Sequence, residues 1–372
     1  MNFLIISHVK HKPNGSTYAA YAPYVREMNL WLKYVDKVTI VAPKIIGKST
    51  PIEIDYKHTD IKLKTIPAIQ FTSIKHSIMA LLNMPMILWT IFKACKRADH
   101  IHLRCPGNIG LLGCFVQILF PKKSKTAKYA GNWDPNTIQP KSYRLQKWLL
   151  SNTLLTKNMQ VLVYGDWKNQ TKNIKSFFTA TFTNSEIEQP IERDYSSKLK
   201  FIFVGSLVVG KRPLLTIKII EAIIAKGKDV HLNMYGDGVL KEELQDYITA
   251  NNLNEYITLH GNQEKNVVKK ALKEAHFSIL PSKSEGWPKA IAEAMFFGVI
   301  PIVTKISCVP YMLDYGNRGV LIEPELESAI NSIIVELSIE DALKHKASKA
   351  AAWSQHYTLD VFESEIYKLI KN

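Results

Sequence analysis

Short apolar runs alternate with longer segments of helical periodicity along the whole chain. Continuous apolar runs are typical of strands buried on both faces, and their alternation with helices predicts parallel sheets. The runs form two sets, which are Phe3–Ser7, Val38–Ala42, His100–Leu103, Ala127–Ala130 and Val161–Tyr164, and then Phe201–Val204, Val230–Tyr235, Tyr256–Leu259, Phe277–Leu280 and Val299–Val303. The sequence therefore predicts two doubly wound, Rossmann-like α/β domains.

A polar and charged segment joins the two sets of predicted strands. Asn184 to Leu199 contains Pro190 and few large apolar residues, which is typical of an interdomain linker. We therefore predict an N-terminal domain over residues 1–190 and a C-terminal domain over residues 191–353. A last helix, about Leu359 to Lys371 within residues 354–372, follows an aromatic segment and is expected to pack back on the N-terminal domain.

The positive charge lies in the first half of the chain. Residues 1–190 carry 26 lysines and arginines against 10 acidic residues, whereas the remainder carries 22 against 23. Such asymmetry favours an anionic partner for the first half, with lysines that serve only solubility as the alternative. A nucleic acid partner is disfavoured, because we find neither basic residues interleaved with exposed aromatics nor a known binding module.

Two apolar stretches, Ile78 to Trp89 and Ile109 to Phe120, are candidate membrane contacts. Both are shorter than the ~20 residues needed to span a bilayer. Lys93, Lys96 and Arg97 follow the first stretch, a combination that suits a helix lying on an anionic membrane surface. A core helix with a basic end explains the same pattern.

The compartment is predicted from the N-terminus and the cysteines. Met1 to Ser7 runs directly into a strand and has no features of an export signal. The four cysteines show no C-x-x-C spacing, so we expect buried free thiols in a reducing compartment. We predict a cytoplasmic protein.

The stretch SEGWPKAIAEAMFFGVIPIV, residues 284–303, carries two carboxylates, Glu285 and Glu293. It predicts a strand, a tight loop, a helix whose first residue is Pro288, and a stop at Gly298. Glu293 would then lie roughly 7 Å beyond the helix start. A glycosidase-like acid and base at the wider, inverting separation is one interpretation, and two separate ligand-holding roles are the other.

Glycine turns follow three other predicted strands. Gly205 opens a turn that leads to Lys211 and Arg212 just before a helix, an arrangement suited to a diphosphate. Gly236-Asp237-Gly238 and Gly261-Asn262 end the next two strands and would allow the backbone to approach a ligand closely.

Taken in order, FVGSLVVGKRP, MYGDG, LHGN and SEGWPKAIAEAMFFGVIPIV resemble the motifs of glycosyltransferase family 4, the group 1 glycosyltransferases. The resemblance covers residues 200 to about 325, and its E-x7-E segment is the most specific part. It implies the GT-B fold, with two Rossmann-like domains facing a cleft. It also implies metal-independent transfer of a sugar with retention of configuration, and we find no D-x-D metal motif.

Carried over by residue, the resemblance assigns Lys211 and Arg212 to the donor diphosphate, Glu285 to the donor sugar and Glu293 to the ribose hydroxyls. The remaining donor-side candidates are Gly205, Gly236, Gly238, Gly261, Asn262, Gly286, Trp287, Pro288 and Lys289. Ser206 departs from the family, which usually has an arginine there.

The first half matches the family less well, and its candidates come from local pattern. Where many relatives have a histidine, this chain has the segment Ala130-Gly131-Asn132-Trp133-Asp134. Asn132 and Asp134 are candidate contacts to acceptor or sugar, with an Asp-Pro turn as the alternative. Arg104 lies near the end of a predicted strand, and Gly15 and Ser16 follow the first strand.

These observations predict a hexosyltransferase that uses a nucleoside diphosphate sugar as substrate and needs no cofactor. We expect a lipid-linked or polysaccharide glycan acceptor, an anionic membrane surface as partner, and a role in cell-surface polysaccharide biosynthesis. A nucleotide-sugar 2-epimerase of the same fold and a catalytically silent membrane-associated partner subunit are the alternatives. Donor sugar, base, acceptor, linkage and oligomeric state are not readable from the sequence.

Overall fold

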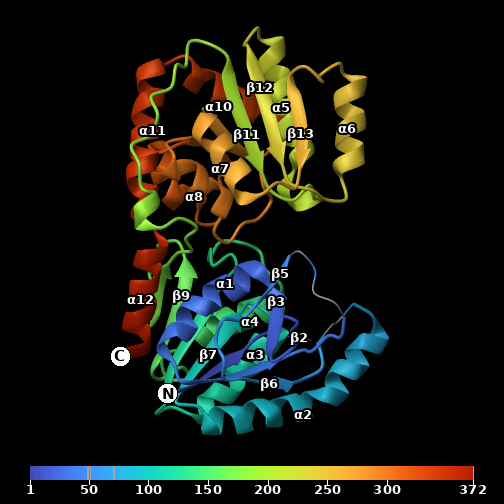
Figure 1. Ribbon diagram of the computed structural model, residues 1–372, viewed down its shortest axis with the longest axis vertical. Helices are drawn as coiled ribbons and strands as arrows, with labels where there is room; N and C mark the ends of the chain where they lie inside the picture. Colours follow the sequence, from blue (N-terminus) through green and yellow to red (C-terminus); the bar gives the residue numbers. More distant parts are fainter. Residues whose placement is uncertain (48–49, 51, 70–71, 372) are drawn as a thin grey trace. The chain divides into compact units, whose positions relative to one another are not determined.

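The computed structural model describes residues 1–47, 50, 52–69 and 72–371 (Figure 1). The chain forms two compact units: Met1–Phe177 together with the segment from Glu363 onward is unit 1, and Phe178–Phe362 is unit 2. Both units have a parallel sheet with helices on its two faces, as the alternating pattern predicts. The expected doubly wound α/β class is therefore confirmed.

Unit 1 is built on a parallel sheet with the order β10-β9-β8-β7-β1-β4-β6. Its strands are β1 (Asn2–Ile6), β4 (Lys37–Ala42), β6 (Ile61–Thr65), β7 (His100–Cys105), β8 (Ser124–Tyr129), β9 (Met159–Tyr164) and β10 (Ile174–Phe177). A small antiparallel sheet of β2 (Lys12–Asn14), β3 (Thr17–Tyr21) and β5 (Glu53–Asp55) lies beside it. β6, β10 and this small sheet were not predicted.

Two groups of helices cover the sheet of unit 1. On one face, α2 (Ile74–Arg97), α3 (Asn108–Val116) and α4 (Lys141–Ser151) contact one another and enclose a core of strand residues. On the other face, Trp31 of α1 (Ala22–Trp31) packs on Phe3 and His102. The central strands β1 and β7 are buried because helices cover both sides of them.

Unit 2 has a parallel sheet with the order β13-β12-β11-β14-β15-β16. Its strands are β11 (Leu199–Val204), β12 (Val230–Tyr235), β13 (Ile257–Gly261), β14 (Phe277–Leu280), β15 (Ile300–Thr304) and β16 (Val320–Ile322). Its helices are α5 (Pro213–Ala225), α6 (Lys241–Ala250), α7 (Lys265–Glu274), α8 (Lys289–Phe296), α9 (Val309–Met312), α10 (Leu326–Leu337) and α11 (Glu340–Ser354). All five predicted strands are present with small shifts at their ends.

The segment predicted as a linker is a packed part of unit 2. The boundary lies between Phe177 and Phe178 rather than at Pro190. Arg193 is buried and donates to the carbonyls of Ala275, Phe297 and Gly298, so this charge caps helix ends of unit 2, although other charged residues of the segment are exposed. The prediction was wrong because a polar composition does not distinguish a solvated linker from one whose polar groups are paired.

One helix boundary also differs from expectation. α8 begins at Lys289, one residue after Pro288, which occupies the N-cap position. The last helix, α12, spans Leu359–Lys371 as expected, and from Glu363 onward it belongs to unit 1. Glu363 binds Lys33 at 2.6 Å and Glu365 binds Lys175 at 2.6 Å, so ion pairs hold this end of the chain on unit 1.

Candidate functional site

The strand order of unit 2 reverses between β11 and β14. From β11, the chain continues to β12 and β13 on one side and returns to β14, β15 and β16 on the other. Loops that leave two such neighbouring strands in opposite directions open a crevice at their carboxyl ends, which is where ligands bind in open α/β sheets. The two loops here are those of Lys211 and Glu285.

Lys211 and Glu285 meet at this reversal point. The Lys211 ammonium lies 2.5 Å from the Glu285 carboxylate, and the Lys283 N–H donates to the Gly210 carbonyl at 2.8 Å. The Glu285 side chain is 7% exposed and that of Lys211 is 29% exposed. The pair therefore consists of a nearly buried anion and a cation that still reaches solvent.

Arg212 stands at the start of α5 in a left-handed backbone conformation, with φ of 51°. This turn lets Pro213 begin the helix, where the absence of an N–H has no cost. Arg212 makes no ion pair with the residues that the structure describes. Two cations therefore flank the N-terminus of α5, and only one of them is paired.

The predicted glycines hold neighbouring loops against one another. A Cβ at Gly236 would lie 2.0 Å from the Gly205 carbonyl oxygen, and one at Gly238 would lie 2.4 Å from the Leu207 carbonyl oxygen. The Gly236 N–H donates to the Gly261 carbonyl at 2.8 Å. These glycines thus allow neighbouring loop backbones to pack closely at the carboxyl edge of the sheet. The sequence predicted that they would allow close approach to a ligand. Asn262 follows and is exposed.

The loop after Glu285 is anchored by its aromatic residue. The Trp287 ring stacks on Trp353 with centroids 5.9 Å apart and meets Tyr357 at 5.7 Å. The Gly286 carbonyl accepts from the Cys308 thiol at 2.9 Å. Trp287 is therefore a packing residue that fixes the loop and the start of α8 at Lys289.

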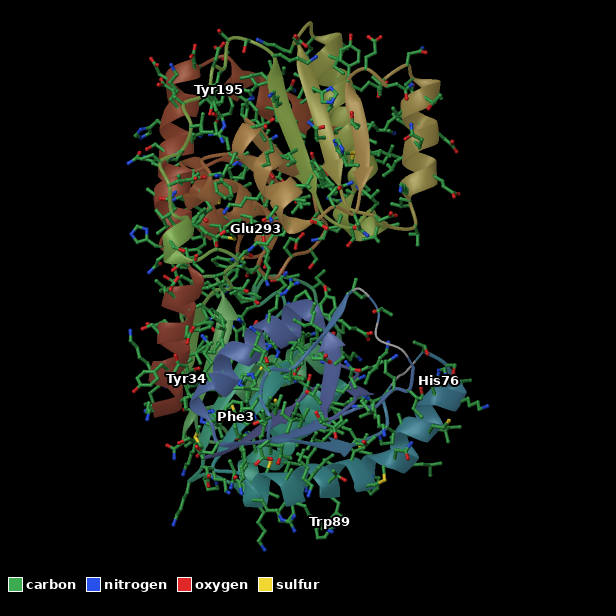
Figure 2. All side chains as sticks on the ribbon, in the orientation of Figure 1. Phe3, Tyr34, His76, Trp89, Tyr195 and Glu293 are labelled. Carbon is green, nitrogen blue, oxygen red and sulfur yellow. The ribbon has the colours of Figure 1, made fainter. Side chains whose placement is uncertain are left out.

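Glu293, labelled in Figure 2, has a contact different from those of the Lys211–Glu285 pair. Its carboxylate accepts a 2.6 Å hydrogen bond from the Thr181 hydroxyl, in the segment that opens unit 2. Burial raises the pKa of Glu293 above its ordinary value, and Lys289 and Lys265 oppose that rise. Glu285 and Glu293 therefore have different partners, an ammonium and a hydroxyl.

In unit 1 the strand order reverses between β1 and β7. His8 follows β1, and its imidazole lies against Gly107 at the start of α3, where a Cβ would be 3.0 Å from Nδ1. Burial and then the charge of Arg104 lower the pKa of His8. The sequence interpretation missed His8, and its place directly after the first strand is the signal that identifies it.

Arg104 does not reach an open surface. Its guanidinium forms a short ion pair with Glu27, whose other oxygen lies 3.3 Å from the Lys128 ammonium. All three side chains are buried. The expectation of a cleft residue is corrected: Arg104 stabilises the packing of α1 on the sheet, because a buried guanidinium needs a carboxylate.

Gly15 and Ser16 form the tip of the β2–β3 hairpin, with φ of 56° at Gly15. They line a cavity of about 210 Å³ beside Lys44 and Thr65. They lie in an added antiparallel sheet and not in the loop directly after β1, which is the place the sequence predicted.

Asn132 and Asp134 build a turn. The Asn132 side-chain oxygen accepts from the Asp134 N–H at 2.8 Å, and the Asp134 carboxylate accepts from the Asn136 N–H at 2.8 Å. These bonds match the Asp-Pro turn that was the alternative interpretation. Trp133 between them is buried and donates to Gln170 at 3.0 Å.

Comparison with known proteins agrees with this geometry. Residues 184–353 match the family model "Glycosyl transferases group 1". An uncharacterized glycosyltransferase of Methanocaldococcus jannaschii is 28% identical over 153 residues, covering 41% of each chain. The UDP-Gal:alpha-D-GlcNAc-diphosphoundecaprenol alpha-1,3-galactosyltransferase of Escherichia coli is 29% identical over 161 residues, covering 42% of this chain and 41% of the relative.

The fold extends beyond the region of sequence similarity. The crystal structure of Anabaena Alr3699/HepE in complex with UDP and glucose superimposes with a TM-score of 0.67 at 14% identity, over 100% of both chains. The matched regions span less than half of the curated relatives named above. Residues 184–353, which carry the Lys211 and Glu285 loops, match the group 1 glycosyl transferases, within a chain that has the GT-B fold.

Proposed function

We propose that this chain is a glycosyltransferase that moves a sugar from a nucleoside diphosphate sugar to a lipid-linked or polysaccharide glycan in cell-surface polysaccharide biosynthesis. The observation that carries this proposal is the Lys211–Glu285 pair at the strand-order reversal of unit 2. It sets a cation for a leaving diphosphate beside a carboxylate for sugar hydroxyls, which are the two chemistries that such a donor needs.

Donor binding would exchange partners at Lys211. Without a donor, Glu285 holds the ammonium at 2.5 Å. A diphosphate carries more negative charge than one carboxylate, so it competes for Lys211 and for Arg212, and leaves Glu285 to accept hydrogen bonds from the sugar. The free N–H groups at the start of α5 add to the attraction of the phosphates.

Catalysis then depends on positive charge that lies beside the leaving diphosphate, which becomes more anionic during the reaction. As the sugar–oxygen bond breaks, negative charge grows on the diphosphate, and the fixed cations stabilise it more strongly than in the ground state. We propose that the reaction needs no metal, since Lys211 and Arg212 supply this charge. We further propose that configuration is retained, with the departing phosphate oxygen taking the acceptor proton on the same face.

The acceptor class is proposed from the relatives. The Escherichia coli relative is named for transfer to a sugar on diphosphoundecaprenol. A lipid-linked acceptor requires the enzyme to work at a membrane, and the excess of cations in residues 1–190 supports attraction to an anionic one. We propose a cytoplasmic protein attached peripherally to the inner face of the membrane.

Helix α2 is the element that would contact the lipid. It is 24 residues long, and by length and apolar composition it is able to cross a membrane. Ile87 and Ile91, however, are fully buried in the core of unit 1, so spanning would dismantle that core. Its outer face exposes Leu81, Leu82 and Trp89, and Trp89 projects outward in Figure 2. A helix that lies in the membrane interface, with its exposed apolar face toward the lipid and its buried face packed on unit 1, fits both observations.

A donor panel tests the proposed function. The purified chain is incubated with nucleotide-sugars, and release of nucleoside diphosphate is measured with and without a glycan acceptor. One donor should be consumed, and Lys211→Ala should lower kcat more than tenfold, since a charge-assisted bond contributes ~1.5–3 kcal/mol. Lys226→Ala, an exposed lysine at the end of α5, is the matched control. Consumption that is equal in parent and Lys211→Ala would reject the assigned role.

A further inference from the structure

Unit 1 contains a large cavity at the end of its sheet opposite to His8 and Arg104. The cavity has a volume of about 1000 Å³ and includes His100, Ser124 and Met159, the first residues of β7, β8 and β9. Arg104 lies near the other end of β7. Sites for small molecules occupy roughly 300–1000 Å³, so the cavity has room for a ligand. Because it lies at the opposite end of the strands, it is separate from His8 and Arg104.

The lining of this cavity is cationic. Its charged residues are Lys125, Lys157, Lys172, Lys175 and Lys368, and among the described residues no acidic side chain lines it. The nearby carboxylate of Glu365 pairs with two of them, Lys175 at 2.6 Å and Lys368 at 2.7 Å. The five lysines are therefore accompanied by one nearby carboxylate, which pairs with two of them.

The other three lysines lack a carboxylate. The Lys125 ammonium donates to the Phe120 carbonyl at 3.0 Å and to the Gln117 carbonyl at 3.4 Å, which satisfies two donors without cancelling the charge. Burial lowers the pKa of Lys125 to about 8. Lys157 and Lys172 are exposed at the rim and make no ion pair with any residue in the described part of the chain. Like charges held around one cavity repel, and an anion placed between them relieves that repulsion.

A buried polar atom also lies in the cavity wall. His100 is 1% exposed, its Nε2 pairs with the Thr126 hydroxyl at 2.8 Å, and its Nδ1 has no hydrogen-bond partner among the described residues. Burial lowers the pKa of His100 to about 4, so the ring is neutral near pH 7. Buried polar atoms in folded proteins nearly always have a partner, and a molecule bound at the cavity wall would supply one.

We propose that this cavity is a second ligand site, which binds a phosphate-bearing anion between Lys125, Lys157, Lys172 and the Lys175–Lys368 pair. Ammonium groups act as point charges that suit phosphate oxygens, and the volume accommodates more than one phosphate. This proposal does not rest on the proposed transferase activity, because all of its residues lie in unit 1.

The position of the cavity allows two sources for the phosphate. Lys123, in the loop that carries Ser124 and Lys125, donates to the Lys96 carbonyl at 2.9 Å, at the end of α2. The cavity therefore lies next to the helix whose outer face is apolar, and a lipid headgroup is within reach of it. A water-soluble phosphorylated compound has the same chemistry, and the experiment separates the two.

Hydrogen exchange of the intact chain tests the site. The probes are inorganic pyrophosphate, vesicles of phosphatidylglycerol and, as a neutral control, vesicles of phosphatidylcholine. We expect protection of peptides covering residues 153–160 and 171–176. Protection by pyrophosphate assigns a soluble ligand, and protection by phosphatidylglycerol alone assigns a headgroup. Peptides over residues 205–213, which hold Lys211, report separately on the diphosphate site of unit 2.

Paired substitutions make the result specific. The double substitution Lys157→Ala with Lys172→Ala should weaken the apparent affinity of the cavity for the anionic probe at least tenfold. Both side chains are exposed, so their loss leaves the core intact. Lys226→Ala with Lys228→Ala, exposed in unit 2, should change nothing. Absence of protection with every anionic probe, or equal protection in the Lys157 and Lys172 double variant, would overturn the proposal.

Discussion

The two carboxylates of the E-x7-E segment have different environments, and this predicts different roles. Glu285 is held by the ammonium of Lys211, whereas Glu293 is held by the hydroxyl of Thr181. An ion pair can be exchanged for another pair of charges, as a donor diphosphate requires. A buried carboxylate with a neutral partner suits hydroxyl groups such as those of a ribose.

Conservative substitutions should separate these roles. Glu293→Gln keeps the shape but removes the charge, so nucleoside diphosphate binding should weaken by roughly 1–2 kcal/mol, seen as a raised KM and a raised Kd for the free nucleotide. Glu285→Gln should not weaken that binding, because it frees Lys211 from a competing carboxylate, and it should lower kcat, because the contact of Glu285 matters as the sugar departs. Calorimetric titration with the bare nucleotide, together with steady-state kinetics, measures both.

A shared acid and base mechanism makes the opposite prediction for Glu293. Both variants would then lose turnover and both would keep their affinity for nucleotide. Tight nucleotide binding by Glu293→Gln therefore contradicts the ribose assignment, whatever its effect on kcat.

Glu293 also predicts how stability depends on pH. Its folded-state pKa is raised by burial, so the protonated acid favours folding below the ordinary value of 4.5, and this advantage is lost as the pH rises through the raised pKa. Glu293→Gln cannot ionise, so its Tm relative to the parent should rise between pH 4 and pH 8. The exposed Glu327→Gln is the control. A Tm difference that stays flat or falls over this range contradicts the account.

At the scale of elements, the sequence predicted the central strands and the edge strand β13, but it missed β6, β10 and β16 at the other sheet edges. β12 (VHLNMY) and β14 (FSIL) have the predicted bounds because short, mostly apolar runs mark strands that helices cover. β6, with the sequence IKLKT, alternates apolar and basic residues and is only partly buried, so it resembles an exposed segment. β2 and β3 form a short hairpin with a proline in it, which also hides their strand character.

The candidate site was predicted where a motif is local and missed where pairing is long-range. Lys211 and Glu285 were predicted separately from their loops, but only the strand order brings them together. Arg104 was assigned to a cleft because its partner Glu27 is 77 residues away. Likewise, nothing near Glu293 in the sequence indicates Thr181.

The outer face of α2 gives a prediction at the element scale. Leu82 is 76% exposed and Trp89 is 56% exposed, so Leu82→Ser with Trp89→Ser should leave Tm unchanged and reduce co-sedimentation with anionic vesicles. Binding by the parent should weaken with salt, because each nearby lysine or arginine contributes ~1 kcal/mol at the membrane surface.

The control for that prediction is Val239→Ser, which removes an equally exposed apolar side chain from unit 2. Vesicle binding that is absent in the parent, or that is as strong in the α2 double variant, would contradict the interfacial role of α2.

At the scale of the whole molecule, the chain assigns different chemistry to its two units. Unit 2 carries the loops of the matched family, in which cation and carboxylate meet at the strand reversal. Unit 1 carries the basic surface, the exposed face of α2 and the lysine-lined cavity. The last helix begins in unit 2 and ends in unit 1, so the chain connects the units twice.

Calorimetric titration of the intact chain with nucleoside diphosphates tests the central claim, which is that the Lys211 loop of unit 2 binds the donor diphosphate. At least one nucleoside diphosphate should bind, Lys211→Ala should weaken its Kd tenfold or more, and Lys226→Ala should bind as the parent does, because only Lys211 stands beside Glu285 at the strand reversal. Failure of every nucleoside diphosphate to bind, or a Kd that is unchanged in Lys211→Ala, would contradict the account.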